Sequence, residues 1–385
     1  MASENWTLRR FHHSGDEYFS DMLHAIRHAR RSILVETYIF EWDSLTRLLM
    51  EELRRARERG CEVKILVDGF GSFYWLETLA QECREAGIEL RVWKPLPRGF
   101  LGLQSLIRRA GFRVTRLLRQ FNRRNHRKLT LIDERLVFLG SMNWTQVHCE
   151  RLMGLRAWRD SGVALEGPAV QHILRAMRLA WRRAGRSQPL RKAWRRGLRD
   201  PRYKSLTSAV RLNQSWKDRR HLTSDLLRRL RRSQQRVRIE SAYFLPTRAL
   251  LVALKKAARR GVPVEVIQPG PSDVPAVKWA AAAMSRNLIK AGVRLYEYQP
   301  RILHAKFLII DGWAALGSTN MNHRSFFHDL EVEAVFEDAA DVEGLNRQWQ
   351  ADRRLSRVLT EIEINAAPWW QRWLESWAFR LRWFL

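Results

Sequence analysis

The sequence predicts an α/β protein built from two copies of one unit. Short runs rich in Val, Ile, Leu and Phe alternate with segments of helical length that end on Arg-Gly or Ala-Gly, a helix-stop signal. Three segments of the first half recur in the second: 29–40 as 233–244, 55–72 as 255–272, and 85–95 as 290–300. Each half should therefore run strand, helix, strand, helix, strand and two further strands, with buried, largely parallel strands covered by helices.

The first half carries extra residues before its last two strands. Pro95 lies 31 positions before His126. The matching Pro300 lies only 4 positions before His304, so the first half is longer by 31 − 4 = 27 residues. This insertion, at about 98–124, contains eight arginines and no acid, and its apolar residues recur in one helical stripe. We expect an amphipathic helix that either packs on the core or lies on anionic lipid.

A basic segment, 175–215, separates the two halves. Positions 175–204 hold twelve Lys and Arg residues and one acid, Asp200. A charge run of this kind is typical of a solvated linker. It sets the expected halves at 1–174 and 216–360.

The last segment, 361–385, is a second amphipathic candidate. It holds five tryptophans interleaved with arginines. Because so many tryptophans are costly to leave in water, the segment either docks on the core or lies at a membrane interface.

Two copies of one motif carry the chemistry. "NHRKLTLID" and "LHAKFLIID" lie 178 positions apart. Residues i and i+2 of a strand share a face, so the histidine and lysine of each copy should point the same way. Burying a histidine or a lysine in a strand costs free energy, so these residues are expected to have a function there. The motif residues are His126, Lys128 and Asp133 in the first copy and His304, Lys306 and Asp311 in the second.

The H-x-K-x4-D pattern, followed by Gly-Ser-x-Asn, resembles the phospholipase D superfamily. The second pattern occurs in both copies, at Gly140, Ser141 and Asn143 and at Gly317, Ser318 and Asn320. In that family two copies meet across a pseudo-twofold axis and form one active site. The resemblance covers nearly the whole chain and implies a duplicated phospholipase D-like α/β/α sandwich.

These residue types suit phosphodiester transfer without a metal ion or cofactor. Lys128 and Lys306 can neutralise charge that develops on the non-bridging oxygens. One imidazole attacks phosphorus to give a phosphohistidine, and the other moves the proton of the alcohol. By resemblance, His126 is expected to be the nucleophile and His304 the acid and base. Neutral donors to the phosphate oxygens are expected from Ser141, Asn143, Ser318 and Asn320.

Each imidazole also needs an acceptor on its other nitrogen. The resemblance supplies Asp160, in "WRDSGVALEGPAV", and Glu331, in "HDLEVEAVF". Relatives often carry asparagine two residues before the second acid, where this chain has Asp329, and this departure affects a substrate contact rather than the catalytic pair. Asp133 and Asp311 complete the catalytic motifs, and we expect them to fix strand ends rather than to touch the substrate.

The composition indicates an anionic partner. Lys and Arg number 69 against 40 Asp and Glu, a net charge of +29, and there are 17 tryptophans. This charge suits nucleic acid or an anionic membrane, and tryptophan favours the membrane interface. The apolar faces of 103–121 and 370–384 would have no use on DNA, so no nucleic acid is expected. No run reaches the roughly 18–20 apolar residues of a membrane span, so membrane contact should be peripheral.

Three phospholipase D-type activities are compatible with the motifs. The segments "ILVETYIFEWD", "LVDGFGS" and "AYFLP" and the Trp/Arg-rich end resemble bacterial cardiolipin synthases, most closely the B type. That resemblance implies transfer of a phosphatidyl group from one phosphatidylglycerol to another, with release of glycerol, on the cytoplasmic side of the bacterial membrane. The alternatives are a hydrolytic phospholipase D, a phospholipase D-family nuclease and, outside enzymes, a membrane-binding scaffold with an inactive site.

Overall fold

The protein is described by a computed structural model. It places residues 5–96, 123–184, 207–272, 275–365 and 377. Most of the expected insertion (98–124) and most of the C-terminal segment (361–385) lie outside these residues, so their amphipathic character stays a prediction. Across the described ranges, no helix combines the length and the apolar character that crossing a membrane requires.

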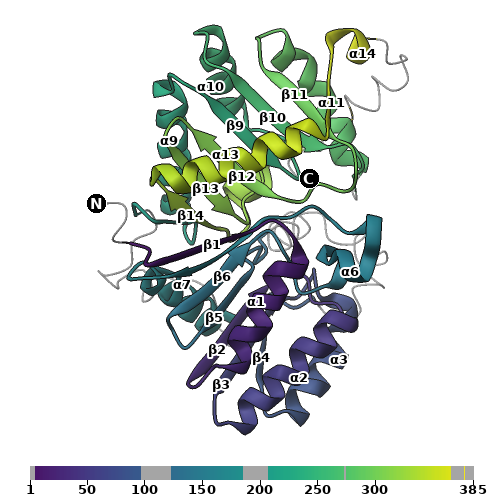
Figure 1. Cartoon of the computed structure of the whole chain (residues 1–385), viewed down its shortest axis with the longest axis vertical. Coiled ribbons are helices and arrows are strands. Elements are labelled where there is room, and N and C mark those ends of the chain that lie inside the picture. Colours follow the sequence, from purple (N-terminus) through teal and green to yellow (C-terminus); the bar gives the residue numbers. More distant parts are fainter. Residues whose placement is uncertain (1–4, 97–122, 185–206, 273–274, 366–376, 378–385) are drawn as a thin grey trace, which may run out of the picture.

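The chain forms two similar halves, each built on one mixed sheet (Figure 1). The first half contains β1 (Leu8–His12), α1 (Gly15–Arg27), β2 (Ser32–Thr37), α2 (Ser44–Glu58), β3 (Glu62–Asp68), the 3-10 turn η1 (Phe73–Trp75), α3 (Leu76–Glu85), β4 (Glu89–Trp93), β5 (Leu129–Ile132), β6 (Leu136–Gly140), η3 (Gln146–His148), α6 (Glu150–Met153), η4 (Gly154–Arg156), β7 (Gly162–Glu166) and α7 (Val170–Ala184). The second half contains β8 (Val210–Leu212), α9 (Trp216–Arg232), β9 (Val237–Ser241), α10 (Arg248–Arg259), β10 (Val264–Pro269), α11 (Pro275–Ile289), β11 (Arg294–Tyr298), β12 (Lys306–Ile310), β13 (Trp313–Gly317), α12 (His323–Phe327), β14 (Val332–Phe336), α13 (Ala339–Arg354), β15 (Ser356–Val358) and α14 (Glu361–Asn365).

The two sheets have the same strand order, which confirms the predicted duplication. The first runs β1-β7-β6-β5-β2-β3-β4. The second runs β8-β14-β13-β12-β9-β10-β11 and adds β15 at its far edge. The four glycines that follow α2, α3, α10 and α11 all have positive φ, between 65° and 91°, as the helix-stop signals predicted. These glycines are Gly60, Gly87, Gly261 and Gly292.

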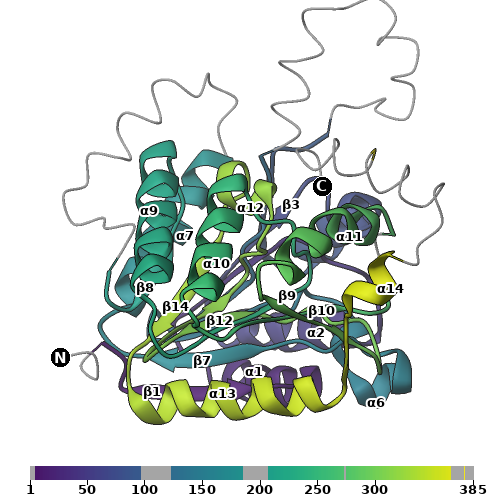
Figure 2. The same cartoon turned by 90° about the horizontal axis from the view of Figure 1, so that it is seen from above.

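Each half has its own core, and a third core joins the two. Helices α1, α2 and α3 pack on one sheet, and α9, α10 and α11 on the other (Figures 1 and 2). The shared core combines strands β5–β7 and β12–β14 with helices α7 and α13, including the fully buried Trp349. A buried ion pair reinforces this joint, because Arg159 donates to Asp352 of α13 through Nε (3.0 Å) and Nη2 (2.7 Å).

Two expectations about the chain differ from the structure. The strands are not largely parallel: β2–β3–β4 and β9–β10–β11 are, but the remaining pairs in both sheets are antiparallel. The motif strands β5 and β12 each turn back through a tight hairpin, with no helix to carry a parallel crossover. The expected linker 175–215 also overlaps both halves, since α7 runs to Ala184 and β8 pairs with β14 from Val210.

Candidate active site

Two reciprocal backbone bridges join the halves at the motifs. Asn125, just before His126, pairs with Leu330. Leu303, just before His304, pairs with Arg159. Because each bridge joins the residue before a histidine to the residue before an acid of the other half, both histidines reach across to the opposite half, as a pseudo-twofold arrangement requires.

His126 is held by the acid of the second half. Its Nδ1 lies 3.1 Å from both carboxylate oxygens of Glu331. Glu331 in turn accepts hydrogen bonds from the hydroxyls of Ser318 and Ser325, the latter at 2.6 Å. With Nδ1 engaged, Nε2 is the nitrogen of His126 that remains for chemistry.

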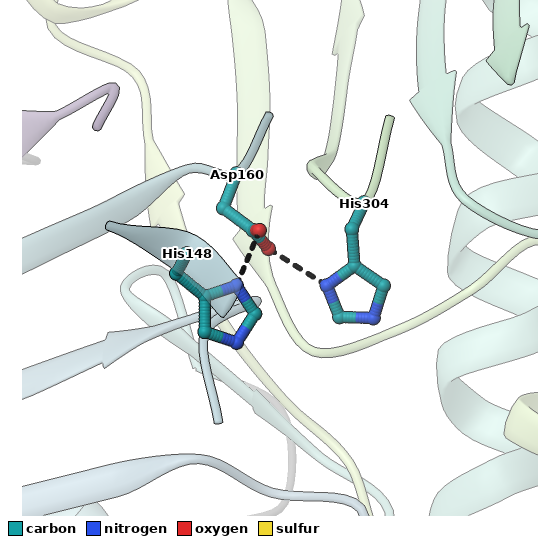
Figure 3. A group of neighbouring side chains, drawn as sticks. All are labelled: His148, Asp160 and His304. Atoms are coloured by element: carbon teal, nitrogen blue, oxygen red, sulfur yellow. Dashed lines mark hydrogen bonds and ion pairs between the residues drawn. The ribbon is translucent and has the colours of Figure 1, made fainter. Parts of the chain in front are cut away.

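His304 is held by the acid of the first half (Figure 3). Its Nδ1 lies 2.7 Å from Oδ1 of Asp160, which also accepts from the Ser141 hydroxyl at 2.6 Å. The other carboxylate oxygen, Oδ2, lies 2.6 Å from Nδ1 of His148. Among the described residues, Asp160 thus contacts two imidazoles, whereas Glu331 contacts one.

His148 is a buried site residue that sequence reasoning missed. Its Nε2 accepts a hydrogen bond from the backbone N–H of Asn143 at 3.0 Å, so Nδ1 must carry the proton that faces Asp160. The repeat holds the signal that could have found it. His148 lies five residues after Asn143, and at the same distance after Asn320 the second half has Ser325, whose hydroxyl fills the equivalent place.

The two motif lysines lie beside the histidines and are almost completely buried. Nζ of Lys128 donates to the carbonyl of His126 at 2.7 Å, and Nζ of Lys306 donates to that of His304 at 2.6 Å. Burial lowers the pKa of Lys128 well below its usual value, and Glu331 opposes this shift. An anionic phosphate bound here would favour the charged form of Lys128.

Both histidines favour the neutral form in this environment. Burial, and then Lys128, lower the pKa of His126 well below its usual value. Burial, and then Lys306, lower the pKa of His304 to about 3, against the opposing effect of Asp160.

The pKa values of the two acids shift in opposite directions. Burial raises the pKa of Glu331 to about 7, although Lys128 opposes it. Burial alone would also raise the pKa of Asp160, but the imidazoles of His148 and His304 hold it well below its usual value. Asp160 is therefore the more firmly ionised acid.

Two expected site residues, Ser141 and Ser318, have different partners from those predicted. The hydroxyls of Ser141 and Ser318 donate to the acids Asp160 and Glu331 rather than standing free for a phosphate, because the short serine side chain reaches the neighbouring carboxylate. Asp133 and Asp311 contact the backbone at the ends of neighbouring strands, as expected. Each carboxylate accepts hydrogen bonds from three successive backbone N–H groups where the adjoining strand begins, at residues 30–32 and 234–236.

The expected phosphate-binding asparagines are buried in the site region. Oδ1 of Asn143 accepts from the backbone N–H of Ile39 at 3.2 Å. Oδ1 of Asn320 is buried and has no hydrogen-bond partner among the described residues.

Different aromatic rings flank the two histidines. The Tyr38 ring meets His126 edge-on, with centroids 5.0 Å apart, and Nζ of Lys128 lies 5.2 Å from the same ring. The Trp158 ring lies 5.1 Å from His304.

A charged cluster lies on the His126 side. Arg124 donates through its backbone N–H to Oδ1 of Asp329 (3.0 Å), and its guanidinium lies 3.8 Å from Asp68. Nε of Arg324 lies 3.4 Å from the other oxygen of Asp329. Lys94 completes the cluster, since its carbonyl accepts from Nη1 of Arg124 at 3.0 Å. Asp329 thus ties the two halves together.

One group of described residues has the composition of a metal site. His148, Asp160 and His304 bring ligand atoms within 4.8 Å of one another. Both Nδ1 atoms point at the carboxylate, at 2.6 and 2.7 Å, and each bond requires an Nδ1 proton. A metal ion would have to displace these protons, so the group fits a hydrogen-bond relay better than a metal centre.

The fold and site together define a duplicated phospholipase D-like protein. A family model described as "Cardiolipin synthase, PLD-like domain" matches residues 22–176 and 226–353, and the chain belongs to this family. The solved structure of phosphatidylserine synthase from Haemophilus influenzae Rd KW20 is similar in fold, with a TM-score of 0.69 at 16% identity, over 97% of this chain and 93% of that one.

Named relatives match most of the chain. Cardiolipin synthase B of Salmonella typhi is 33% identical over 332 residues, which cover 84% of this chain and 75% of the relative. Cardiolipin synthase B of Escherichia coli (strain K12) is 32% identical over 336 residues, with the same shares. The probable cardiolipin synthase YwiE of Bacillus subtilis (strain 168) is 28% identical and covers 91% of this chain and 66% of the relative.

Proposed function

We propose that this protein is a cardiolipin synthase. It transfers the phosphatidyl group of one phosphatidylglycerol to the glycerol hydroxyl of a second and releases glycerol. The observation that carries the proposal is the reciprocal contact of His126 with Glu331 and of His304 with Asp160, which gives one site two oriented imidazoles. Two such groups are what a two-step phosphoryl transfer needs.

In the first step, Nε2 of His126 attacks phosphorus. A nitrogen–phosphorus bond forms, the bond to the glycerol oxygen breaks, and Nε2–H of His304 donates its proton to that oxygen. The bound anionic phosphodiester and the ionised Asp160 both favour the imidazolium form of His304 that this step requires. Glu331 stabilises the positive charge that the phosphorylated imidazole of His126 acquires.

In the second step, the hydroxyl of another phosphatidylglycerol attacks the phosphohistidine. Nε2 of His304 accepts the hydroxyl proton, the new oxygen–phosphorus bond forms, and the bond to His126 breaks. Lys128 and Lys306 neutralise the non-bridging oxygens throughout, and Asn143 and Asn320 add neutral donors. Asp160, Glu331 and His148 act as positioning residues.

The substrates are membrane lipids, so we infer that the protein works on an anionic bilayer as a peripheral protein. The net charge of +29 supports this, because each Lys or Arg near an anionic surface contributes about 1 kcal/mol. The basic insertion at 98–124 and the tryptophan-rich segment 361–385 are the sequence candidates for additional contact.

The test is to incubate the purified protein with phosphatidylglycerol vesicles and EDTA and to analyse the products. Cardiolipin and glycerol in equal amounts are expected, because no step requires a divalent metal. Phosphatidic acid with glycerol but no cardiolipin would indicate a hydrolase. Cleavage of a supplied DNA with the lipids left intact would indicate a nuclease, and either result would overturn the proposal.

A further inference from the structure

Most of the exposed aromatic residues of the described chain lie on one side of the two sheets, the side at which strands β3, β8 and β10 end. Phe70, Tyr74 and Trp75 follow the carboxyl end of β3, and Tyr74 is 86% exposed. Two further members lie near the starts of helices, and one ends a helix. We call the set the aromatic rim: Phe70, Tyr74, Trp75, Trp216 of α9, Trp279 of α11 and Phe327 of α12.

The strand register puts this side at the active site. β3 ends at Asp68, whose carboxylate accepts the backbone N–H of Asn125, next to His126, at 2.9 Å. β8 ends just before Asn213, whose side chain accepts the backbone N–H of Glu331 at 2.6 Å. β10 runs parallel to β9, and the end of β9 pairs with Lys306. The segments that carry the rim thus leave the sheets where the catalytic residues lie.

Direct contacts link the rim to the charged cluster. The guanidinium of Arg124 lies 5.4 Å from the Phe70 ring centroid. Arg324, whose Nε contacts Asp329, belongs to the same short helix as Phe327. The rim therefore borders the His126 side of the site.

Trp216 also lies near the charged cluster, because its helix α9 contacts Asp329. Arg219, one turn after Trp216, donates from Nη2 to the carbonyl of Asp329 at 3.0 Å. Arg220 lies 4.6 Å from the Trp216 ring centroid.

The chemistry of the rim fits an anionic bilayer surface. Tryptophan and tyrosine favour the membrane interface, and the exposed Arg220 beside Trp216 suits lipid phosphates. The exposed aliphatic residues Leu48 of α2 and Val252 of α10 lie instead on helices that cover the outer faces of the sheets.

The described residues on either side of the basic insertion adjoin the charged cluster. The described chain stops at Leu96, two residues after Lys94, and resumes at Arg123, next to Arg124. The segment between them is basic by sequence.

We propose that the aromatic rim is the surface on which the protein docks to an anionic phospholipid bilayer. Docking presents the His126 side of the site to the lipid headgroups. The inference rests on the proposed function, because it takes the substrate to be a membrane lipid. It adds to that function which face of the molecule meets the membrane and which described side chains make the contact.

The test is co-sedimentation of the full chain with phosphatidylglycerol/phosphatidylcholine vesicles at fixed ionic strength. The double variant Tyr74→Ser/Trp75→Ser and the single variant Trp216→Ser remove rim aromatics. Leu48→Ser and Val252→Ser remove exposed apolar side chains from other faces. Because the double variant removes two aromatic side chains that docking would bury, it should bind at least about tenfold more weakly. The two controls should bind like the unaltered protein, and equal thermal midpoints establish that all variants fold.

Unchanged vesicle binding in both rim variants would overturn the inference. The inference would also be overturned if the rim variants changed only the oligomeric state, as measured by light scattering. The rim would then be a contact between two copies of the chain. Binding is measured without turnover, so the two proposals fail separately. A protein that binds through the rim but makes no cardiolipin would contradict the proposed function alone. One that makes cardiolipin with rim-independent binding would contradict only this inference.

Discussion

The surroundings of His126 and of His304 differ far more than the duplicated fold does. His126 shares two 3.1 Å contacts with Glu331, and His304 makes one 2.7 Å contact with Asp160. Asp160 also accepts from His148, where the second half has a serine. The same backbone therefore holds one histidine through a firmly ionised acid and the other through an acid whose pKa is raised to about 7.

The charged cluster sharpens the contrast between the two sides. The repeat aligns each of its members with an uncharged residue on the His304 side, Arg324 with Val147 among them, and aligns Tyr38 with an alanine. The aligned pairs are Asp68 with Gln268, Lys94 with Gln299, Arg124 with Ile302, Asp329 with Trp158, and Tyr38 with Ala242. A symmetric site could not assign attack to one histidine and proton transfer to the other, so these differences are where we expect the division of labour to arise.

Replacing the histidines one at a time should separate their roles most strongly. His126→Ala should abolish turnover. His304→Ala should lower kcat on phosphatidylglycerol by about 10²–10⁴-fold, the usual contribution of a general acid or base. With phosphatidyl-p-nitrophenol, whose leaving group needs no proton, His304→Ala should still release a stoichiometric burst of p-nitrophenol, and His126→Ala should release none. Stopped-flow absorbance measures the burst, and a burst in His126→Ala would reverse the assignment.

Replacing either acid should affect the same reaction step as replacing the histidine that the acid contacts. Asp160→Asn and Glu331→Gln should each lower kcat by about 10²-fold, since a hydrogen bond to a charged group contributes up to about 3 kcal/mol. Asp160→Asn should keep the p-nitrophenol burst, as His304→Ala does, and Glu331→Gln should slow it. Burst kinetics of the two variants check the pairing, and the opposite pattern would mean that each acid serves its own half.

Making the two halves more alike should have a smaller effect. His148→Ser copies Ser325 and should lower kcat by about tenfold, with KM little changed and the p-nitrophenol burst retained, because it weakens the hold on Asp160 alone. Ser325→Ala is the matched control and should slow the burst instead. A loss of thermal stability in His148→Ser with an unchanged pH profile of kcat would show that His148 has only a structural role.

The pH dependence of stability should carry opposite signs for His304 and for Glu331, the acid that holds His126. The pKa of His304 is lowered from 6.5 to about 3, so its contribution to stability is complete above pH 6.5 and is lost as the pH falls towards 3. The pKa of Glu331 is raised from 4.5 to about 7, so its contribution is complete below pH 4.5 and is lost as the pH rises towards 7.

Urea unfolding between pH 4 and 7.5 checks these signs with His304→Gln and Glu331→Gln. The stability difference from the unaltered protein should shrink towards low pH for His304→Gln and towards high pH for Glu331→Gln. Each slope should not exceed about 1.4 kcal/mol per pH unit. Parallel slopes would contradict the asymmetry.

The sequence predicted the repeated elements and the motif residues because both follow from local spacing. Short apolar strands, helix-stop glycines and the H-x-K-x4-D pattern all lie within single segments. Spacing did not reveal the strand directions at β5 and β12, which depend on hairpin geometry. It also could not tell which acid meets which histidine, because Glu331 reaches His126 only through the inter-half bridge at Leu330. His148 was missed because it lies outside the two motifs, and its contact with Asp160 depends on the folded structure.

The most direct test of two unlike halves in one site is to locate the covalent intermediate. The protein would be mixed with phosphatidylglycerol, quenched in alkali within one turnover, digested and analysed by mass spectrometry. The account predicts a phosphatidyl adduct on the peptide that contains His126 and none on the peptide that contains His304. An adduct on His304, equal labelling of both histidines, or cardiolipin formed with no adduct on either would contradict it.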